Sequence, residues 1–152
     1  MNIIRKTYEE LTKDELFDII RTRIDVFVVE QKCPYPELDD TDKRCLHIFT
    51  RDDFGSIAAY LRLFDRTSEP GVMQIGRVLT VQRGRGYAKA LLKDAIARAK
   101  TCGAKEIYLE AQVYAIGLYE KAGFVVTSDE FLEDGIPHVE MRLKTDREAD
   151  HA

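Results

Sequence analysis

Two arginines alternate with two glycines in the segment Arg83-Gly84-Arg85-Gly86, which follows an apolar run and precedes a long amphipathic pattern. A helix that begins here leaves its first backbone N–H groups without internal partners, and its dipole places partial positive charge at that end. Glycine lets the backbone approach a ligand closely and adopt positive φ without strain. The segment is therefore suited to binding an anion such as a pyrophosphate, with Arg83, Arg85 and Lys89 adding charge.

Taken alone, this segment does not specify one ligand. It lacks the Gly-Lys-Ser/Thr ending of a P-loop and is not the complete dinucleotide-binding pattern. A tight turn after a strand also explains paired glycines, and this alternative stays open for the isolated motif. An RNA-binding segment rich in Arg and Gly does not fit, because the motif occurs once and stands within periodic structure.

Apolar periodicity predicts the elements that position this segment. Thr12 and Glu15 form a capping box, so we expect a helix of about four turns that reaches Val28. A strand at 72–81 leads into the glycine-rich segment, and a helix at 87–102 follows it. The remaining elements are strands at 3–8, 47–50, 57–64, 107–111, 124–127 and 139–143, and a short helix at 113–122.

This order of elements predicts the α/β class (α+β mixed), with a mixed, mostly antiparallel central sheet of about six to seven strands flanked by helices. We expect the last two strands to be joined across Asp134-Gly135, a favoured hairpin turn. No repeat, low-complexity tract or linker interrupts the pattern. Residues 1–152 are therefore expected to form one domain, with a frayed polar tail at 145–152.

Two motifs occur in order along this framework. Arg83-Gly84-Arg85-Gly86-Tyr87-Ala88 opens the long helix, and Leu118-Tyr119-Glu120-Lys121-Ala122-Gly123-Phe124 ends the short one. With both motifs, the chain resembles the GNAT acetyltransferases over nearly its whole length. Three further segments are similar to the ElaA-like branch, whose members are mostly predicted N-acetyltransferases of unsettled substrate: Phe27-Val28-Val29-Glu30-Gln31, Cys33-Pro34-Tyr35 and Glu133-Asp134-Gly135-Ile136-Pro137-His138.

The resemblance implies the acyl-CoA N-acyltransferase fold and transfer of an acetyl group from acetyl-CoA to a primary amine, by direct attack in a ternary complex. It implies that Val78, Leu79 and Thr80 hydrogen-bond the pantetheine arm where their strand splays from the 107–111 strand. A bulge there would turn an N–H group toward the thioester carbonyl. The residues implied to hold the pyrophosphate are Arg83, Gly84, Arg85, Gly86, Tyr87, Ala88 and Lys89, and Gln112 is a further candidate for the pantetheine arm.

Tyr119 is the catalytic acid that the resemblance implies. A phenol with a pKa of about 10 is protonated at neutral pH and can donate its proton to a departing thiolate, whose thiol has a pKa of about 8.5. The alternative is that Tyr119 is only a core aromatic residue on an amphipathic helix.

The sequence does not identify the base that deprotonates the amine. The candidates are Glu30, at the end of the first helix, Glu110, near the end of a strand, and the histidines His47 and His138, of which the two glutamates are preferred. Glu30, His47 and His138 are also candidates for contacting the acceptor, although a solvated glutamate and structural histidines explain them as simply.

Two further segments have two explanations each. The acidic run 37–42 either attracts a cationic acceptor or is solvated charge, and residues 133–138 form either a plain hairpin turn or a wall of the acceptor pocket.

Composition limits the partners. Across 152 residues the chain is 45% hydrophobic and 33% charged, with a net charge of −4, so it supports an ordinary core and does not suit a general nucleic-acid binder. Cys33, Cys45 and Cys102 are an odd, unpaired set typical of a reducing compartment. A zinc site would use Cys33, Cys45 and His47, but these lack the close paired spacing of structural zinc sites. No secretory signal or membrane span is visible, so we expect a cytoplasmic protein without metal or membrane partner.

Two other functions stay open beside the enzyme. One is a non-catalytic acyl-CoA-binding or sensing module, and the other is a protein-interaction domain that docks through Pro34-Tyr35-Pro36. The sequence does not identify the acceptor, which is a small-molecule or protein amine, or decide whether the protein is a homodimer.

Overall fold

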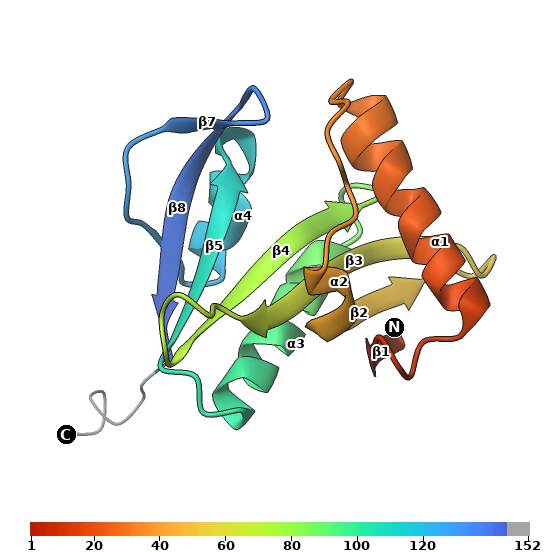
Figure 1. The fold of residues 1–152 in the computed structure, drawn as a ribbon, viewed down its shortest axis with the longest axis horizontal. Helices are drawn as coiled ribbons and strands as arrows, with labels where there is room; N and C mark the ends of the chain where they lie inside the picture. Colours follow the sequence, from red (N-terminus) through yellow and green to blue (C-terminus); the bar gives the residue numbers. More distant parts are fainter. Residues whose placement is uncertain (146–152) are drawn as a thin grey trace.

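The computed structural model describes residues 1–145 (Figure 1). Residues 146–152, which include His151 and most of the expected polar tail, lie outside the described residues. Thr145 belongs to the fold rather than to a frayed tail, because it is buried and its amide donates to the carbonyl of Lys105 at 3.0 Å. The elements are β1 (Ile3–Thr7), α1 (Lys13–Arg23), the π-helix η1 (Ile24–Glu30), α2 (Thr41–Arg44), β2 (Leu46–Arg51), β3 (Ile57–Asp65), β4 (Val72–Thr80), α3 (Tyr87–Thr101), β5 (Glu106–Gln112), the 3-10 helix η2 (Val113–Ala115), α4 (Ile116–Lys121), β6 (Val125–Val126), β7 (Phe131–Glu133) and β8 (Ile136–Lys144).

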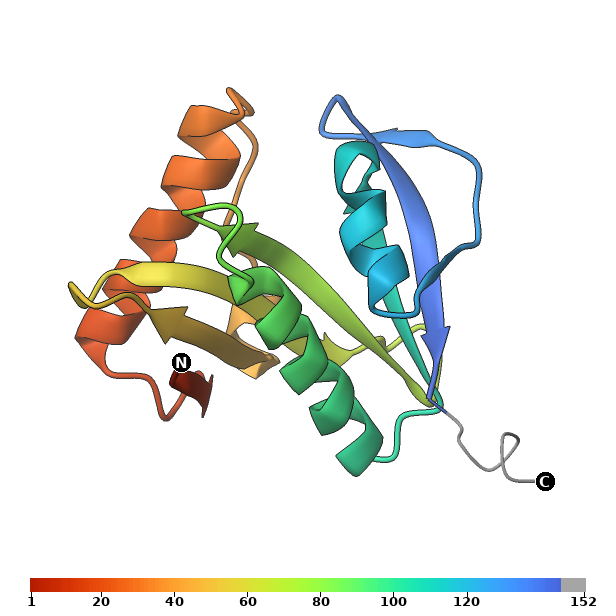
Figure 2. The ribbon, with the colours of Figure 1, turned by 180° about the vertical axis from the view of Figure 1, so that it is seen from behind.

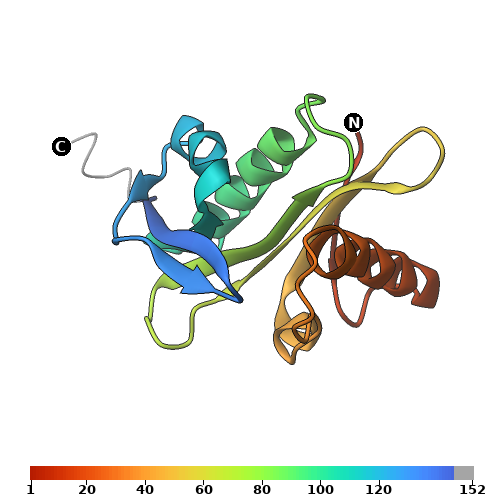
Figure 3. The same cartoon turned by 90° about the horizontal axis from the view of Figure 1, so that it is seen from above.

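The strands form one eight-stranded sheet in the order β1-β2-β3-β4-β5-β8-β6, with β7 also paired to β8. Every neighbouring pair is antiparallel except β4 and β5, which confirms the predicted mixed, mostly antiparallel sheet. The sheet has one strand more than the six to seven expected, because the sequence did not predict β7. It is β7, and not β6, that is joined to β8 across Asp134 and Gly135. Figure 3 shows α1 on one face of the sheet and α3 and α4 on the other.

The parallel pair of β4 and β5 holds together at one end only. Val72, Met73 and Gln74 pair with residues of β5, and beyond them the two strands diverge, as Figure 1 and Figure 2 show. Against β3, the register of β4 gains one residue between Gly76 and Leu79, and Arg77 there has a φ of 53°. The predicted splay and the predicted bulge are therefore both present.

Helix α3 supplies the main apolar cover of the sheet. Leu91, Leu92, Ala95 and Ala99 are almost fully buried and pack on the strands through one stripe, at the spacing that predicted the helix. Within residues 1–145, no helix is long and apolar enough to cross a membrane.

The first helix begins as predicted but ends differently. Thr12 Oγ1 accepts from the Glu15 amide at 3.0 Å, and Glu15 Oε1 accepts from the Thr12 amide at 2.9 Å, which completes the capping box. From Ile24 the backbone widens into the π-helix η1, where the sequence predicted a uniform α-helix. Wider turns of this kind often occur at functional sites.

Three carboxylates of the acidic run 37–42, those of Glu37, Asp39 and Asp42, pair with buried arginines and are therefore not simply solvated charge. Arg23, only 1% exposed, donates to Asp42 at 2.6 Å and to Glu37 at 2.8 Å. Arg62, also buried, donates to Asp42 at 2.9 Å and to Asp39 at 2.6 Å. Burial alone would raise the pKa of Asp42, but the hydrogen bond and charge of Arg23 hold it below its ordinary value. The sequence did not reveal this network, since nothing in the helical pattern marks Arg23 as buried.

Replacing Arg23 with Gln should lower the free energy of unfolding by about 3–5 kcal/mol, because it removes the buried cation that pairs with both Asp42 and Glu37. Arg21→Gln is the matched control, since Arg21 is 64% exposed and lies 3.6 Å from Asp18. Its expected cost is at most about 1 kcal/mol. Urea unfolding monitored by circular dichroism measures both, and equal stabilities of the two variants would contradict the importance of the buried network.

Candidate active site

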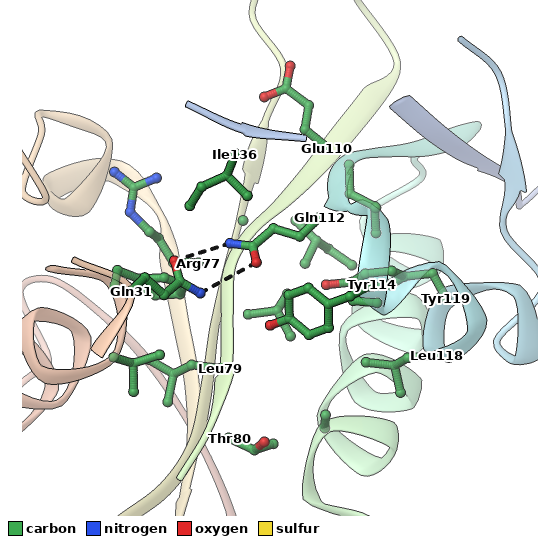
Figure 4. A pocket seen from close by; sticks show the side chains of 18 of the residues that line it. Gln31, Arg77, Leu79, Thr80, Glu110, Gln112, Tyr114, Leu118, Tyr119 and Ile136 are labelled. Atoms are coloured by element: carbon green, nitrogen blue, oxygen red, sulfur yellow. Dashed lines mark hydrogen bonds between the residues drawn. The ribbon is translucent and has the colours of Figure 1, made fainter. Parts of the chain in front are cut away.

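A cleft of about 570 Å³ opens where β4 and β5 diverge. Its walls come from η1, β4, the loop that precedes α3, the start of α3, β5, α4 and the β7–β8 hairpin. The volume is within the range of small-molecule sites. Figure 4 shows side chains from these separate elements directed into the same space.

Most residues that the sequence singled out line this cleft. The set includes the proposed donor-binding residues Val78, Leu79, Thr80, Arg83, Gly84, Arg85, Gly86, Tyr87, Ala88, Lys89 and Gln112, together with Glu30, Glu110, Tyr119 and His138. The structure therefore brings together segments that lie as far apart as residues 30 and 138 in the chain.

His47 does not belong to this group, which corrects its place as an acceptor-binding candidate. His47 belongs to β2, is fully buried inside the protein and does not line the cleft. Nδ1 lies 2.6 Å from the hydroxyl of Tyr60, and Nε2 lies 2.9 Å from the carbonyl of Asp42. Burial lowers the pKa of His47, so this is a neutral structural histidine.

The start of α3 has the geometry that the glycines predicted. Gly84 and Gly86 have φ values of 76° and 74°, and Gly86 is the N-cap of α3 without any side-chain hydrogen bond. The first amides of the helix therefore have no capping partner and are available to an anion. Arg83 lies beside them, with its guanidinium 5.6 Å from the centre of the Tyr114 ring.

Tyr119 extends from α4 into the cleft (Figure 4) and is 6% exposed. Its ring meets Phe124 edge-on at a centroid distance of 6.2 Å. Burial, with a smaller contribution from Tyr114, raises the pKa of the Tyr119 phenol, so the group is neutral and protonated at any physiological pH.

Two contacts cross the mouth of the cleft. The side-chain amides of Gln31 and Gln112 exchange hydrogen bonds of 3.4 and 3.3 Å (Figure 4). The thiol of Cys33 lies 3.3 Å from the carbonyl oxygen of Asp134. Together they link the end of the first helix to β5 and to the β7–β8 hairpin. The sequence did not identify Gln31 as a residue of the cleft. It was noted only as part of the segment that is similar to the ElaA-like branch.

The hairpin at residues 133–138 is a tight turn whose residues also form part of the wall of the cleft. Asp134 and Gly135 have φ values of 52° and 77°, as a tight hairpin requires, while Glu133 and His138 line the cleft. Burial raises the pKa of Glu133 to about 7, with the charge and hydrogen bond of Glu110 adding to the shift. Sequence reasoning did not single out Glu133, because nothing in the local sequence places it in the cleft.

Tyr108, two residues before Glu110 on β5, forms a hydrogen bond with the Glu110 carboxyl group. The Tyr108 hydroxyl lies 2.7 Å from Glu110 Oε2 and 2.6 Å from Glu140 Oε2. The guanidinium carbons of Arg66 and Arg142 lie 3.7 and 4.8 Å from the centre of the Tyr108 ring. The cleft thus combines a helix start without a side-chain cap, a protonated phenol and a group of carboxyls, which suits acid and base chemistry on a ligand that carries phosphates.

Comparison with known proteins agrees with this geometry. A family model described as an acetyltransferase (GNAT) domain matches residues 9–145. A UPF0039 protein of Schizosaccharomyces pombe is 41% identical over 148 residues, covering 95% of this chain and 97% of the relative. Protein ElaA of Escherichia coli is 31% identical over 144 residues, covering 88% of this chain and 90% of ElaA.

Solved structures give the same result. The crystal structure of Escherichia coli ElaA matches with a TM-score of 0.86, covering 94% of this chain and 99% of ElaA. An acyl-CoA N-acyltransferase from Pseudomonas aeruginosa matches with a TM-score of 0.85 and 36% identity, again covering 94% and 99% of the two chains. Fold, cleft and relatives therefore place this chain in the GNAT acetyltransferase superfamily, within its ElaA-like branch.

Proposed function

We propose that this protein is an N-acetyltransferase that moves the acetyl group of acetyl-CoA to a primary amine by direct attack in a ternary complex. The observation that supports this most is the convergence of the splayed strands, the start of α3 and Tyr119 on one cleft. The family membership supports acyl transfer, and the cleft supports the choice of donor, because its two ends suit a pyrophosphate and a thioester.

In this proposal the donor lies along β4 and the start of α3. Amides between Arg83 and Lys89 bind the pyrophosphate, and backbone groups of Val78, Leu79 and Thr80 bind the pantetheine arm. The bulge at Arg77 supports the latter role, because it frees backbone groups of β4 that an uninterrupted ladder would use. Gln112 joins the pantetheine site by exchanging its bond to Gln31 for one to the donor.

The reaction follows from these positions. An ammonium loses one proton, and the nitrogen lone pair forms a bond to the thioester carbon while the carbonyl π electrons move to oxygen. When the carbonyl forms again, the carbon–sulfur bond breaks and its electron pair leaves with sulfur, which takes the phenol proton of Tyr119. The nitrogen loses its second proton, which restores the phenol, so one proton in total is released.

The acceptor side is formed by the remaining wall of the cleft. Glu30 is exposed at the end of η1, and His138 lies on β8 opposite Gln112, so we assign both to contacts with the acceptor. Glu30 and Glu110 are the candidate bases on the two sides of this space. Coenzyme A is a substrate here, and the proposal needs no metal.

The cysteines favour direct attack over an acyl-enzyme. Cys33 is the cysteine that lines the cleft, and burial, with the nearby charges of Asp134 and Glu37, raises the pKa of its thiol. A raised thiol pKa leaves little thiolate at neutral pH, which is the opposite of what a nucleophile requires. Burial raises the pKa of Cys45 to about 12.

Acetyl-CoA should stabilise the protein by about 2.7 kcal/mol when its concentration is 100 times the dissociation constant. The double substitution Arg83→Ala with Arg85→Ala should weaken binding about tenfold, since it removes charge beside the first amides of α3. Arg98→Ala is the control, because Arg98 is exposed near the other end of the same helix and outside the cleft. Isothermal titration measures all three proteins, and equal affinities would contradict the placement of the pyrophosphate.

Tyr119→Phe should lower kcat by about 10²- to 10⁴-fold and leave acetyl-CoA affinity unchanged, because it removes the proton donor and keeps the packing against Phe124. Tyr8→Phe, at a phenol that does not line the cleft, should keep the activity of the natural protein. Steady-state kinetics separates kcat from affinity. An unchanged kcat in Tyr119→Phe would exclude the phenol as the acid.

The proposed activity itself is tested with a panel of amines that includes polyamines, aminoglycosides, amino acids and peptide amino termini. Release of free coenzyme A thiol from acetyl-CoA should depend on the presence of one class of amine. Binding of acetyl-CoA without release for any amine would instead support a sensing module, and an absence of acetyl-CoA binding would overturn the proposal.

A further inference from the structure

The bulge in β4 carries an arginine where a glycine is expected. The pairing of β4 with β3 is interrupted after Gly76 and resumes at Leu79. In between, two residues of β4, Arg77 and Val78, stand against one residue of β3, Leu61, which is the count of a β-bulge. Arg77 has a φ of 53°, in the left-handed region that is unfavourable for a residue with a Cβ. Glycine, which adopts this backbone freely, stands one position earlier instead.

A left-handed arginine inside a strand needs contacts that hold it there. Three non-glycine residues of the described part of the chain have positive φ, and the other two, Lys32 and Asp134, lie in turns. A residue in a sparsely populated region of φ and ψ persists only where the surrounding structure determines its backbone, and such residues gather at functional sites. The side chain of Arg77 supplies contacts of this kind.

Glu37 binds the Arg77 guanidinium at two points. Nε of Arg77 donates to Oε2 of Glu37 at 2.8 Å, and Nη2 donates to the backbone carbonyl of Glu37 at 2.9 Å. Arg23 binds the same two oxygens through its own Nε and Nη2, at 2.8 and 3.0 Å. Arg23 is buried and also bonded to Asp42, so Glu37 is a fixed anchor. Glu37 therefore connects the bulge of β4 to the end of the first helix.

The bulge lies in the wall of the cleft where the strands separate. Arg77 and Val78 both line the cleft, and Figure 4 includes Arg77 among the side chains there. The pairing of β4 with β5 ends before them, at Gln74, so β5 does not satisfy their backbone groups. A bulge also leaves its extra residue without a partner in the ladder. A backbone N–H group of this kind can donate to the carbonyl oxygen of a donor in the cleft.

We propose that Arg77 is a positioning residue for acyl transfer: its contact with Glu37 holds the left-handed backbone of the bulge, and that backbone presents an N–H group to the thioester oxygen. The inference rests on the proposed function and adds the side chain on which the bulge depends. When the amine bonds to the carbonyl carbon, the π electrons move to oxygen, and the N–H group stabilises this charge while it keeps its proton. Such a contact strengthens in the transition state, so it raises kcat more than it raises affinity.

Glycine and alanine at position 77 separate the effect of the backbone from that of the side chain. Both remove the guanidinium, but only glycine adopts positive φ without strain. Arg77→Gly should therefore keep the bulge, and Arg77→Ala should lose it. Arg51→Ala is the matched control, because Arg51 is 26% exposed against 27% for Arg77, pairs with Asp18 at 3.1 Å and lies outside the cleft. Circular dichroism identifies the variants that fold.

The first test needs no acceptor. Acetyl-CoA labelled with ¹³C at its carbonyl is bound to each protein, and isotope-edited infrared spectroscopy records the carbonyl stretching frequency, which falls when the oxygen accepts a hydrogen bond. The frequency should be lowest in the natural protein and in Arg51→Ala, higher in Arg77→Gly and highest in Arg77→Ala. Equal frequencies in the natural protein and Arg77→Ala would overturn the inference alone. A natural protein that does not bind acetyl-CoA would instead overturn the proposed function.

The second test uses the acceptor that the amine panel identifies. Arg77→Ala should lower kcat by about 10²- to 10³-fold, the effect of losing one such donor, with the KM for acetyl-CoA little changed. Arg77→Gly should lower kcat by no more than about tenfold, because its backbone still forms the bulge, and Arg51→Ala should match the natural protein. A purely structural role would leave kcat per folded molecule unchanged in all variants. Equal kcat in Arg77→Gly and Arg77→Ala would also contradict the inference, because the side chain alone would then matter.

Glu37→Gln tests the other partner and does not require Arg77→Ala to fold. The substitution removes the charge that Arg77 binds, so it should lower kcat of the natural protein by up to about tenfold. In the Arg77→Gly protein the guanidinium is already absent, and Glu37→Gln should change kcat less than about twofold. Effects that multiply in the double variant would show that Glu37 acts independently of Arg77, which would overturn the inference and leave the proposed acetyl transfer intact.

Discussion

The structure depends on the limited pairing of two parallel strands. β4 and β5 share three residue pairs and then separate, which leaves the facing edge of β4 without a strand partner over the rest of its length. An open sheet edge inside a protein is unfavourable unless its N–H and C=O groups find other partners. A ligand that lies along this edge and offers amides and carbonyls can satisfy them. The cleft opens at this divergence, and the start of α3 and Tyr119 line it.

The buried ion pairs hold the first wall of the cleft in place. Arg23 joins the first helix to the acidic run, and Arg62 joins that run to β3. Arg77, at the bulge of β4, donates to Glu37 at 2.8 Å, so the same network extends to the residue whose backbone departs from the ladder. Burying these charges is unfavourable on its own, and the network is stable because each charge has hydrogen-bonded partners. The opposite wall, formed by β5, β8 and the hairpin, is held by the ladder of β8 and by the contacts of Tyr108.

The sequence predicted the parts of this molecule that local chemistry determines. The capping box of Thr12 and Glu15, the apolar stripe of α3 and the glycine-rich helix start were all legible, because each depends on residues within a few positions of one another. The family motifs extended this to the fold and to most residues of the cleft. What the sequence did not reveal depends on contacts between distant segments. The burial of Arg23, the exclusion of His47 from the cleft and the place of Glu133 in the wall of the cleft depend on the assembled sheet.

The central claim is that the space between β4 and β5 holds an acyl-CoA with its sulfur beside Tyr119. A crystal structure of the protein with coenzyme A tests this most directly. The account predicts the pyrophosphate at the amides between Arg83 and Lys89, the pantetheine arm along Val78 to Thr80, and the sulfur within hydrogen-bonding distance of the Tyr119 hydroxyl. Coenzyme A bound elsewhere, or with its sulfur out of reach of that phenol, would contradict it.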